Sequence, residues 1–259
     1  MSKSNDSFGK TLGVVVGLCL VCSLVVSGAA VSLKDRQKLN KERDTQRYVL
    51  EAAGLLDKTS GDIAETYDRY IDARVVNYDT GEFLPQIDAA SYDRAMVSRN
   101  ADTSIKPEDD IASIGRRANY GVVYLVNDEA GDLETVILPV HGYGLWSTMY
   151  AFLAVEPDMN TVKALVYYDQ GETPGLGAEV ENPRWKAQWV GKKLFDENGE
   201  LAIEVVKGGA KPGDIHGVDA LSGATLTSNG VSNSLNYWLS DQGYAAFIEK
   251  VREGELNNG

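Results

Sequence analysis

The chain has 259 residues, a formal net charge of −13, two cysteines and two histidines. This length supports one sizeable hydrophobic core or two small ones. A chain this acidic repels the phosphate backbone of nucleic acids, so the composition argues against nucleic-acid binding.

An uncharged run from Thr11 to Leu33 is the first predicted element. Its 23 residues exceed the roughly 20 that a helix needs to cross a bilayer, so we predict a transmembrane helix after a short tail, residues 1–10. The alternative is a cleaved signal peptide, because Ser27-Gly28-Ala29 could serve as a small-residue cleavage site. Cys19 and Cys22 lie inside the run, and we interpret them as small apolar residues rather than a redox or metal pair.

The rest of the chain has no cysteine, and its only histidines are His141 and His216. The sequence therefore excludes a disulfide framework, a thiol nucleophile and a Cys-ligated iron–sulfur cluster from this part, and it makes a His-based metal centre unexpected. Redox chemistry here would need an organic cofactor.

The charges beside the apolar run bear on orientation. Five basic residues follow the run within ten positions, whereas only Lys3 and Lys10 precede it. The positive-inside rule thus predicts a cytoplasmic C-terminal part. However, acidic residues are interspersed and a large domain follows, which weakens the rule. The resemblance described below implies the opposite face, and we follow it.

Residues 34–119 are predicted to hold a linker helix and the N-terminal part of a globular domain. Residues 36–56 carry one apolar side, which fits a helix continuing from the membrane. Residues 62–72 favour a second short helix, and residues 73–77 favour a strand. Residues 84–119 are polar and show no regular pattern.

Residues 120–259 are predicted to form the main domain. Four apolar, β-branched runs are expected to pair as two hairpins around polar turns. These runs are 121–126, 134–140, 150–155 and 161–168. The remaining predicted elements are a helix over 183–194, a strand over 201–206 and closing helices over 228–239 and 244–252. The fold class is therefore α+β, with an antiparallel sheet and flanking helices after the single N-terminal membrane helix.

Two segments of this domain carry candidate ligand-binding residues. The first runs from His141 to Tyr150, where two glycines allow close backbone approach and Trp146 could pack on a flat ring. A glycine-rich hairpin with a core tryptophan is the alternative. The second runs from Gly171 to Glu179 and can present several backbone N–H groups to the edge of such a ring. An ordinary surface loop is its alternative.

The third segment is the most informative and reads Asp219-Ala220-Leu221-Ser222-Gly223-Ala224-Thr225. Its small residues leave room for a bulky group on Thr225, and Thr227 or Ser228 can cap the helix that follows. A phosphate near that helix start would be favoured by free N–H groups and by the helix dipole. A capping turn without a ligand is the alternative.

This segment resembles the flavinylation motif Asp-x-x-Ser/Thr-Gly-Ala-Thr, in which FMN is esterified through its phosphate to the last threonine. With Gly144-Leu145-Trp146 and Glu172–Gly177, it makes the chain similar to the FMN-binding domain family. Over its whole length the chain resembles the C subunits of bacterial sodium-translocating NADH:quinone oxidoreductases.

The resemblance implies a covalent FMN, held by a phosphoester bond to Thr225, and no catalytic or metal-binding residue. It also implies a set of residues around the cofactor, some with alternative roles. Asp219 would serve recognition by the transferase or help to bind the metal that the transfer needs, and Lys207 could place a positive charge near the flavin or be a solvated lysine. The full set is Thr225, Asp219, Ser222, Gly223, Ala224, Leu226, Thr227, Trp146, Glu172, Thr173, Leu176, Gly177 and Lys207. His216 is expected to be structural.

The resemblance further implies membership of a complex of six subunits in the bacterial inner membrane, with one membrane pass and the globular domain on the periplasmic side. In that complex electrons pass from NADH through flavins and iron–sulfur centres to a quinone while sodium is exported. An FAD-dependent flavin transferase would attach the FMN, and the protein would not be catalytic alone.

Three alternatives remain at this stage. The G subunit of the Rnf complex shares the anchor and the flavin motif. A membrane-anchored scaffold domain would lack the flavin altogether. A stand-alone membrane reductase is disfavoured, because the chain has no NAD-binding glycine fingerprint after a strand and no iron–sulfur cysteines.

Overall fold

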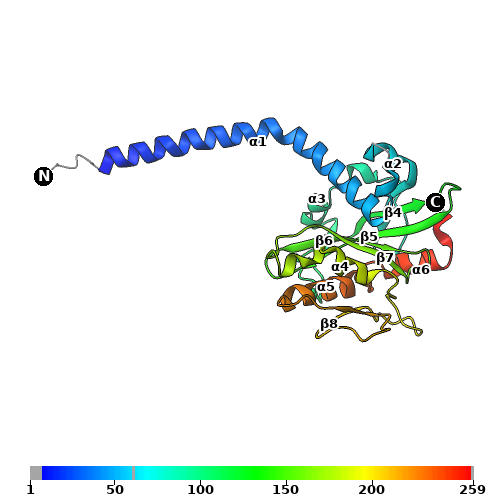
Figure 1. Cartoon of the computed structure of the whole chain (residues 1–259). Coiled ribbons are helices and arrows are strands. Elements are labelled where there is room, and N and C mark those ends of the chain that lie inside the picture. Colours follow the sequence, from blue (N-terminus) through cyan, green and yellow to red (C-terminus); the bar gives the residue numbers. More distant parts are fainter. Residues whose placement is uncertain (1–7, 60–61, 258–259) are drawn as a thin grey trace. The chain divides into compact units, whose positions relative to one another are not determined.

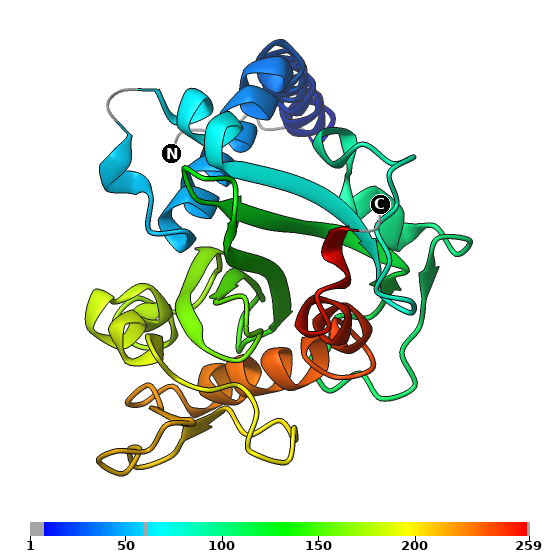
Figure 2. The same cartoon turned by 90° about the vertical axis from the view of Figure 1, so that its right-hand side faces the viewer.

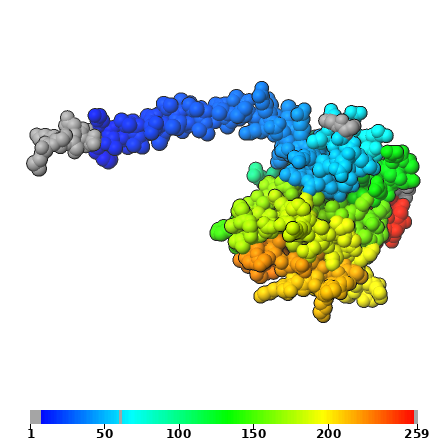
Figure 3. All heavy atoms as spheres, viewed as in Figure 1, coloured from blue at the N-terminus to red at the C-terminus, as the bar shows by residue number. Residues whose placement is uncertain are grey.

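The computed structural model describes residues 8–59 and 62–257, and Figure 1 shows its elements. The chain divides into two compact units, residues 1–45 and 46–259. Helix α1 (Phe8–Ala52) contains the uncharged run and extends into the second unit, so the helix expected over 36–56 continues from the run as predicted, but it ends at Ala52. The apolar side chains of the run are exposed (Figure 3), and the helix is long and apolar enough to cross a membrane.

The second unit is built on a five-stranded sheet with the strand order β1-β4-β5-β6-β7, and every neighbouring pair is antiparallel. This confirms the predicted fold class, and the two predicted hairpins are β4–β5 and β6–β7. The strands are β1 (Ile71–Asn77), β4 (Tyr120–Asn127), β5 (Leu133–Tyr143), β6 (Thr148–Val155) and β7 (Val162–Asp169).

The remaining elements flank or extend this sheet. The helices are α2 (Ile63–Tyr70), α3 (Arg94–Arg99), α4 (Pro183–Lys186), α5 (Thr225–Trp238) and α6 (Ala245–Arg252). Short 3₁₀ turns cover η1 (Leu56–Lys58), η2 (Ala89–Ser91), η3 (Gly177–Glu181), η4 (Ala187–Trp189) and η5 (Glu255–Asn257). Two small ladders pair β2 (Ser104–Ile105) with β3 (Arg117–Ala118) and β8 (Glu204–Val206) with β9 (Gly217–Asp219).

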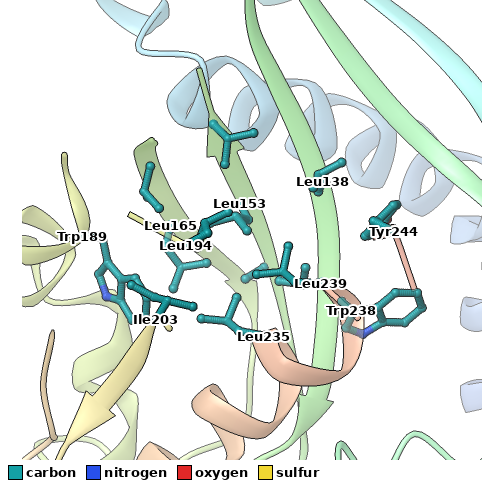
Figure 4. Packing of buried hydrophobic residues seen from close by; sticks show 14 of the residues in the cluster. Leu138, Leu153, Leu165, Trp189, Leu194, Ile203, Leu235, Trp238, Leu239 and Tyr244 are labelled. Atoms are coloured by element: carbon teal, nitrogen blue, oxygen red, sulfur yellow. The ribbon is translucent and has the colours of Figure 1, made fainter. Parts of the chain in front are cut away.

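Alternation along the strands divides the core between the two faces of the sheet. On β5, Val136 and Leu138 belong to one buried cluster while Ile137 between them belongs to the other, because successive strand residues point to opposite faces. The first cluster includes residues of α5 and α6, which Figure 2 shows in orange and red, and Figure 4 shows Leu138 with Leu235 within it. The second cluster includes Val49 from the end of α1.

Several element boundaries differ from the sequence prediction, three of them in residues 183–239. The α-helix expected over 183–194 ends at Lys186 and continues only as the 3₁₀ turn η4 to Trp189. Beyond it, Gly191 takes a φ of +79° and donates its N–H to the carbonyl of Val162. The strand expected from 201 begins at Glu204, since Leu201 makes an isolated bridge to Phe195 instead. The helix expected from Ser228 begins at Thr225, which places the candidate acceptor on its first turn.

Candidate functional site

Thr225 is the first residue of α5, directly after a tight turn. Gly223 adopts a φ of +74°, a left-handed conformation that favours glycine, and this turn redirects the chain into the helix. Ala224 occupies the N-cap position, and no side chain caps the helix there. Thr225 itself is exposed. The fold therefore presents one threonine hydroxyl beside backbone N–H groups that α5 leaves uncapped.

The four hydroxyl residues around this turn differ in environment. Ser222 and Thr225 are exposed, whereas Thr227 and Ser228 are only 1% and 2% exposed. The hydroxyl of Thr227 donates to Glu172, and Ser228 Oγ accepts from the backbone N–H of Leu221. Neither residue is the N-cap, so the prediction that Thr227 or Ser228 caps the helix is wrong. Both serve internal contacts because the helix begins earlier than expected.

Glu172 joins the three predicted segments. Its Oε1 accepts from the N–H groups of Leu145 at 3.0 Å, Trp146 at 2.9 Å and Ser147 at 3.3 Å. Its Oε2 accepts from the Thr227 hydroxyl at 2.6 Å. The β5–β6 turn, the loop after β7 and the first turn of α5 thus meet at one carboxylate. Glu172 is 5% exposed, which is uncommon for a glutamate.

The charge state of Glu172 follows from these donors. Burial alone raises the pKa of this carboxyl, but the hydrogen bonds from Thr227 and the N–H groups of Trp146, Leu145 and Ser147 outweigh it and hold the pKa below its usual range. The group is therefore a carboxylate at neutral pH. In residues 8–59 and 62–257 no ion pair involves it, so hydrogen bonds alone balance its charge.

Exposed apolar side chains come from the same three segments. Trp146 is 64% exposed, so it is not the core tryptophan of the alternative interpretation, and its indole N–H donates to Thr173 Oγ1 at 3.1 Å. Leu176 lies beside Gly223, where an added Cβ would be 3.1 Å from Leu176 Cδ2. Leu226 follows Thr225 and is also exposed. We call Leu145, Trp146, Leu176 and Leu226 the apolar patch.

Asp219 and Lys207 belong to a neighbouring part of the structure. Asp219 ends β9, pairs with Val206 of β8, and accepts the N–H of Ala210 on Oδ1 at 2.8 Å. Its carboxylate therefore fixes the loop that begins with Lys207. Lys207 is exposed and forms no ion pair in the part of the chain that the structure describes. No contact links it to Glu172 or to the apolar patch among these residues.

A pocket of about 430 Å³ borders the same turn, and sequence reasoning missed several of its residues. Arg184, Asn182 and Gln188 line it together with Asp219 and Ser222. The backbone N–H of Asp219 donates to Gln188 Oε1 at 3.1 Å, which ties the pocket wall to β9. Nothing in the local sequence around 182–188 signals this role, because it depends on a segment some 30 residues later.

The two histidines lie in structural positions. His141 is buried between Trp238 and Tyr150, and its Nε2 is 3.3 Å from Arg94 Nη1. Burial and then the charge of Arg94 lower the pKa of His141 well below its ordinary value, so the ring is neutral. His216 Nδ1 contacts the carbonyl of Lys193. No group of metal-binding side chains occurs among the described residues.

Comparisons with known proteins converge on one family. A family model described as "FMN-binding domain" matches residues 144–240, which include Trp146, Glu172 and Thr225. The C subunit of the Na(+)-translocating NADH-quinone reductase of Vibrio parahaemolyticus is 56% identical over 99% of this chain and 100% of its own length. The same subunit of Yersinia pestis is 52% identical over 99% and 98%.

Two solved structures resemble the chain as well. The crystal structure of Shewanella oneidensis NqrC is 42% identical, has a TM-score of 0.79, and aligns over 83% of this chain and 99% of that one. The crystal structure of the corresponding reductase subunit from Parabacteroides distasonis is 30% identical, with a TM-score of 0.63 and coverage of 83% and 96%.

Proposed function

Because the chain belongs to the NqrC family, the C subunits of the Na⁺-translocating NADH-quinone reductase, we propose that Thr225 carries FMN through a phosphoester bond and that the protein relays electrons within that membrane complex. It is the FMN-carrying subunit of an oxidoreductase and is not catalytic alone. Family membership favours NqrC over the G subunit of the Rnf complex.

The single observation that carries the proposal is the placement of Thr225. Its hydroxyl is exposed on the first turn of α5, where uncapped N–H groups and the helix dipole favour a phosphate. Thr227, the next threonine along the helix, is buried and donates to Glu172. The apolar patch offers a surface for a flat ring within reach of the same turn. The residues present therefore fit a covalently attached FMN.

Attachment is a phosphoryl transfer. Thr225 Oγ forms a bond to the FMN phosphorus of FAD, the pyrophosphate P–O bond breaks, AMP leaves, and the hydroxyl proton is released. The fixed left-handed turn at Gly223 and the absence of bulk on Ala224 keep Thr225 accessible to the flavin transferase that performs this step. Ser222 and Asp219 line the adjacent pocket, where they are available for recognition by that enzyme.

Bound FMN supplies reversible electron uptake, and this chain supplies its position. The proposed contacts are with Trp146 and Leu176 of the apolar patch, and with Thr173, which orients the Trp146 indole. The patch is exposed, so a ring there stays open to cofactors of neighbouring subunits. Gly177 contributes by leaving room for Glu172, and Lys207 is a more distant, exposed charge.

We extend the proposal to the domain organisation and the membrane. The tail 1–10 precedes a membrane helix over 11–33, residues 34–119 connect it to the domain, and residues 120–259 form the FMN-binding domain. The protein is anchored in the inner membrane of a bacterium, with this domain in the periplasm, as one of six subunits. Residues 1–7 of the tail lie outside the described residues.

The test is covalent flavin on the full chain, coexpressed with a flavin transferase. The wild type is expected to give a fluorescent band on a denaturing gel and an intact mass increased by one FMN, mapped to the peptide with Thr225. Thr225→Val is expected to be dark, while Thr80→Val, which removes an exposed threonine outside the site, stays fluorescent. A dark wild type, or a fluorescent Thr225→Val, would overturn the assignment.

Sidedness is tested separately, in intact cells and in spheroplasts. A protease added to spheroplasts is expected to digest the globular domain. The mass of the membrane-bound protein is expected to include the N-terminal residues, which would exclude signal-peptide cleavage near Ala29. Protection of the domain in spheroplasts with digestion in inverted vesicles would place it in the cytoplasm, as the charge rule predicts.

A further inference from the structure

We infer that Glu172 is a positioning residue for the flavin: its buried carboxylate fixes the first turn of α5 against the Trp146 turn and places a constant negative charge beneath the flavin site. This inference rests on the proposed function at Thr225. It changes the role implied for Glu172, which was expected to contact the cofactor directly and is instead turned away from solvent into the protein.

Glu172 connects two segments of the site. Within the described residues, Glu172 is the one side chain that hydrogen-bonds both to the backbone of the Trp146 turn and to the first turn of α5. Thr227 lies two residues after Thr225 on the same rigid helix. Glu172 therefore ties the helix that carries the attachment oxygen directly to the turn that carries the Trp146 indole.

The surrounding chain is shaped to hold this carboxylate. A Cβ on Gly144 would lie 2.6 Å from Glu172 Oε1, and a Cβ on Gly177 would lie 2.7 Å from Oε2 and 2.5 Å from Thr227 Oγ1. A side chain at either position would therefore displace the carboxylate. In addition, the Glu172 N–H donates to Gln170 Oε1 at 2.6 Å, which fixes the backbone that carries it.

Glu172 also has an electrostatic effect on the site. Among the described residues the carboxylate accepts hydrogen bonds but pairs with no cation. Dipoles therefore stabilise its negative charge, and no opposite charge neutralises it. A buried charge acts over a longer range than an exposed one because solvent screens it less. Reduction adds negative charge to a flavin, so a fixed carboxylate near it favours the oxidised form. Removing the charge is expected to raise the reduction potential.

Two kinds of variant separate position from charge. Thr227→Val keeps the carboxylate but removes the hydroxyl that ties it to α5, whereas Thr227→Ser keeps the hydroxyl. Glu172→Gln is nearly isosteric and removes the charge. Val75→Ala, at a residue buried in the second cluster, serves as a control that lowers stability without touching the site.

The first measurement needs no flavin. In the Thr225→Val background, amide hydrogen exchange at Leu145 and Trp146 is expected to be slow, and adding Glu172→Leu, which removes both acceptor oxygens, is expected to accelerate it at least tenfold. Val75→Ala lowers the stability of the whole domain, so it is expected to accelerate exchange of the sheet amides and to leave local opening at Leu145 and Trp146 unchanged. Equal exchange with glutamate and leucine at position 172 would overturn the positioning role.

The second measurement is made on the flavinylated full chain. Glu172→Gln is expected to shift the oxidised-to-reduced ratio at fixed potential about tenfold toward reduced flavin, which is about 30 mV for a two-electron couple. Thr227→Val is expected to lower flavin fluorescence anisotropy, and Thr227→Ser is expected to restore it. An unchanged potential in Glu172→Gln, or unchanged anisotropy in Thr227→Val, contradicts the inference.

The two proposals fail in different ways. If covalent flavin persists in Thr225→Val, the proposed function is wrong and the reduction-potential measurement loses its basis. The hydrogen-exchange measurement does not depend on flavin and still tests the role of Glu172. Flavin confined to Thr225, with potential and anisotropy insensitive to Glu172 and Thr227, leaves the proposed function in place and removes the positioning role alone.

Discussion

Thr225 and Thr227 are two residues apart on the first turn of α5, yet the fold exposes the first and buries the second against Glu172. The reason is helical geometry, since residues two apart point to nearly opposite sides of an α-helix. We therefore expect that no flavin moves to Thr227 when Thr225 is replaced by valine. Peptide mass mapping checks this, and a modified Thr227 in that variant would contradict it.

Gly223 forms the tight turn that leads the chain into Thr225. Gly223→Ala forces a side chain into a φ of +74° and within 3.1 Å of Leu176 Cδ2, so we expect a loss of about 1 kcal/mol or more in unfolding free energy. Flavin incorporation should fall as well. Gly131→Ala is a suitable control, because its φ of +90° imposes similar strain where no neighbour lies within 4 Å. Equal incorporation in the two variants would contradict the prediction.

Gly177 lies against the Glu172–Thr227 pair. Gly177→Ala is expected to cost about 1–3 kcal/mol, because the added Cβ overlaps the carboxylate and the Thr227 hydroxyl. Gly171→Ala should cost less, since its Cβ meets only the side chain of Ser147, at 3.1 Å. Denaturant unfolding of the two variants in parallel gives the comparison, and a Gly171 variant that is the less stable would contradict it.

Two buried tryptophans differ in one hydrogen bond. Trp238 Nε1 donates to the carbonyl of His141 at 2.7 Å, whereas Trp189 Nε1 has no partner in the described part of the chain. Trp238→Phe should therefore destabilise the fold more than Trp189→Phe, by about 1 kcal/mol, because it leaves a buried carbonyl unsatisfied. Thermal or chemical unfolding measures the difference, and equal losses would show that the bond contributes nothing net.

The lowered pKa of His141 predicts that the stability of the fold depends on pH. Its pKa in the folded protein lies well below the ordinary 6.5, through burial and then the charge of Arg94, so below that pH the unfolded chain binds the proton first. Stability from this group is complete above about pH 6.5 and is lost as the pH falls, with a slope of at most about 1.4 kcal/mol per pH unit. Unfolding at pH 7.5, 6.5 and 5.5 tests this.

The matched variant for that measurement is His141→Phe, which keeps an aromatic ring between Trp238 and Tyr150. Its unfolding free energy should change less than that of the wild type between pH 6.5 and 5.5. An identical slope in both proteins would assign the acid sensitivity in this range to other groups.

The sequence by itself determined the features that depend on neighbours along the chain. The uncharged run over 11–33 predicted an apolar helix, and the apolar, β-branched runs on either side of Asn127–Asp132 predicted the hairpin of β4 and β5. The small-residue turn before Thr225 was visible in the same way, because its chemistry is contained in seven consecutive residues. Helix ends were less accurate, since Gly191 stops η4 by a conformation that periodicity does not register.

Tertiary structure alone decided which hydroxyl is free and what Glu172 does. The bond from Thr227 to Glu172 joins residues 55 positions apart, and the bond from Leu145 to Glu172 joins residues 27 apart. Arg184 and Gln188 likewise line the pocket together with Ser222, which lies more than 30 residues later in the chain. Burial and hydrogen bonding depend on which segments the sheet brings together, and a local pattern of residues does not contain that information.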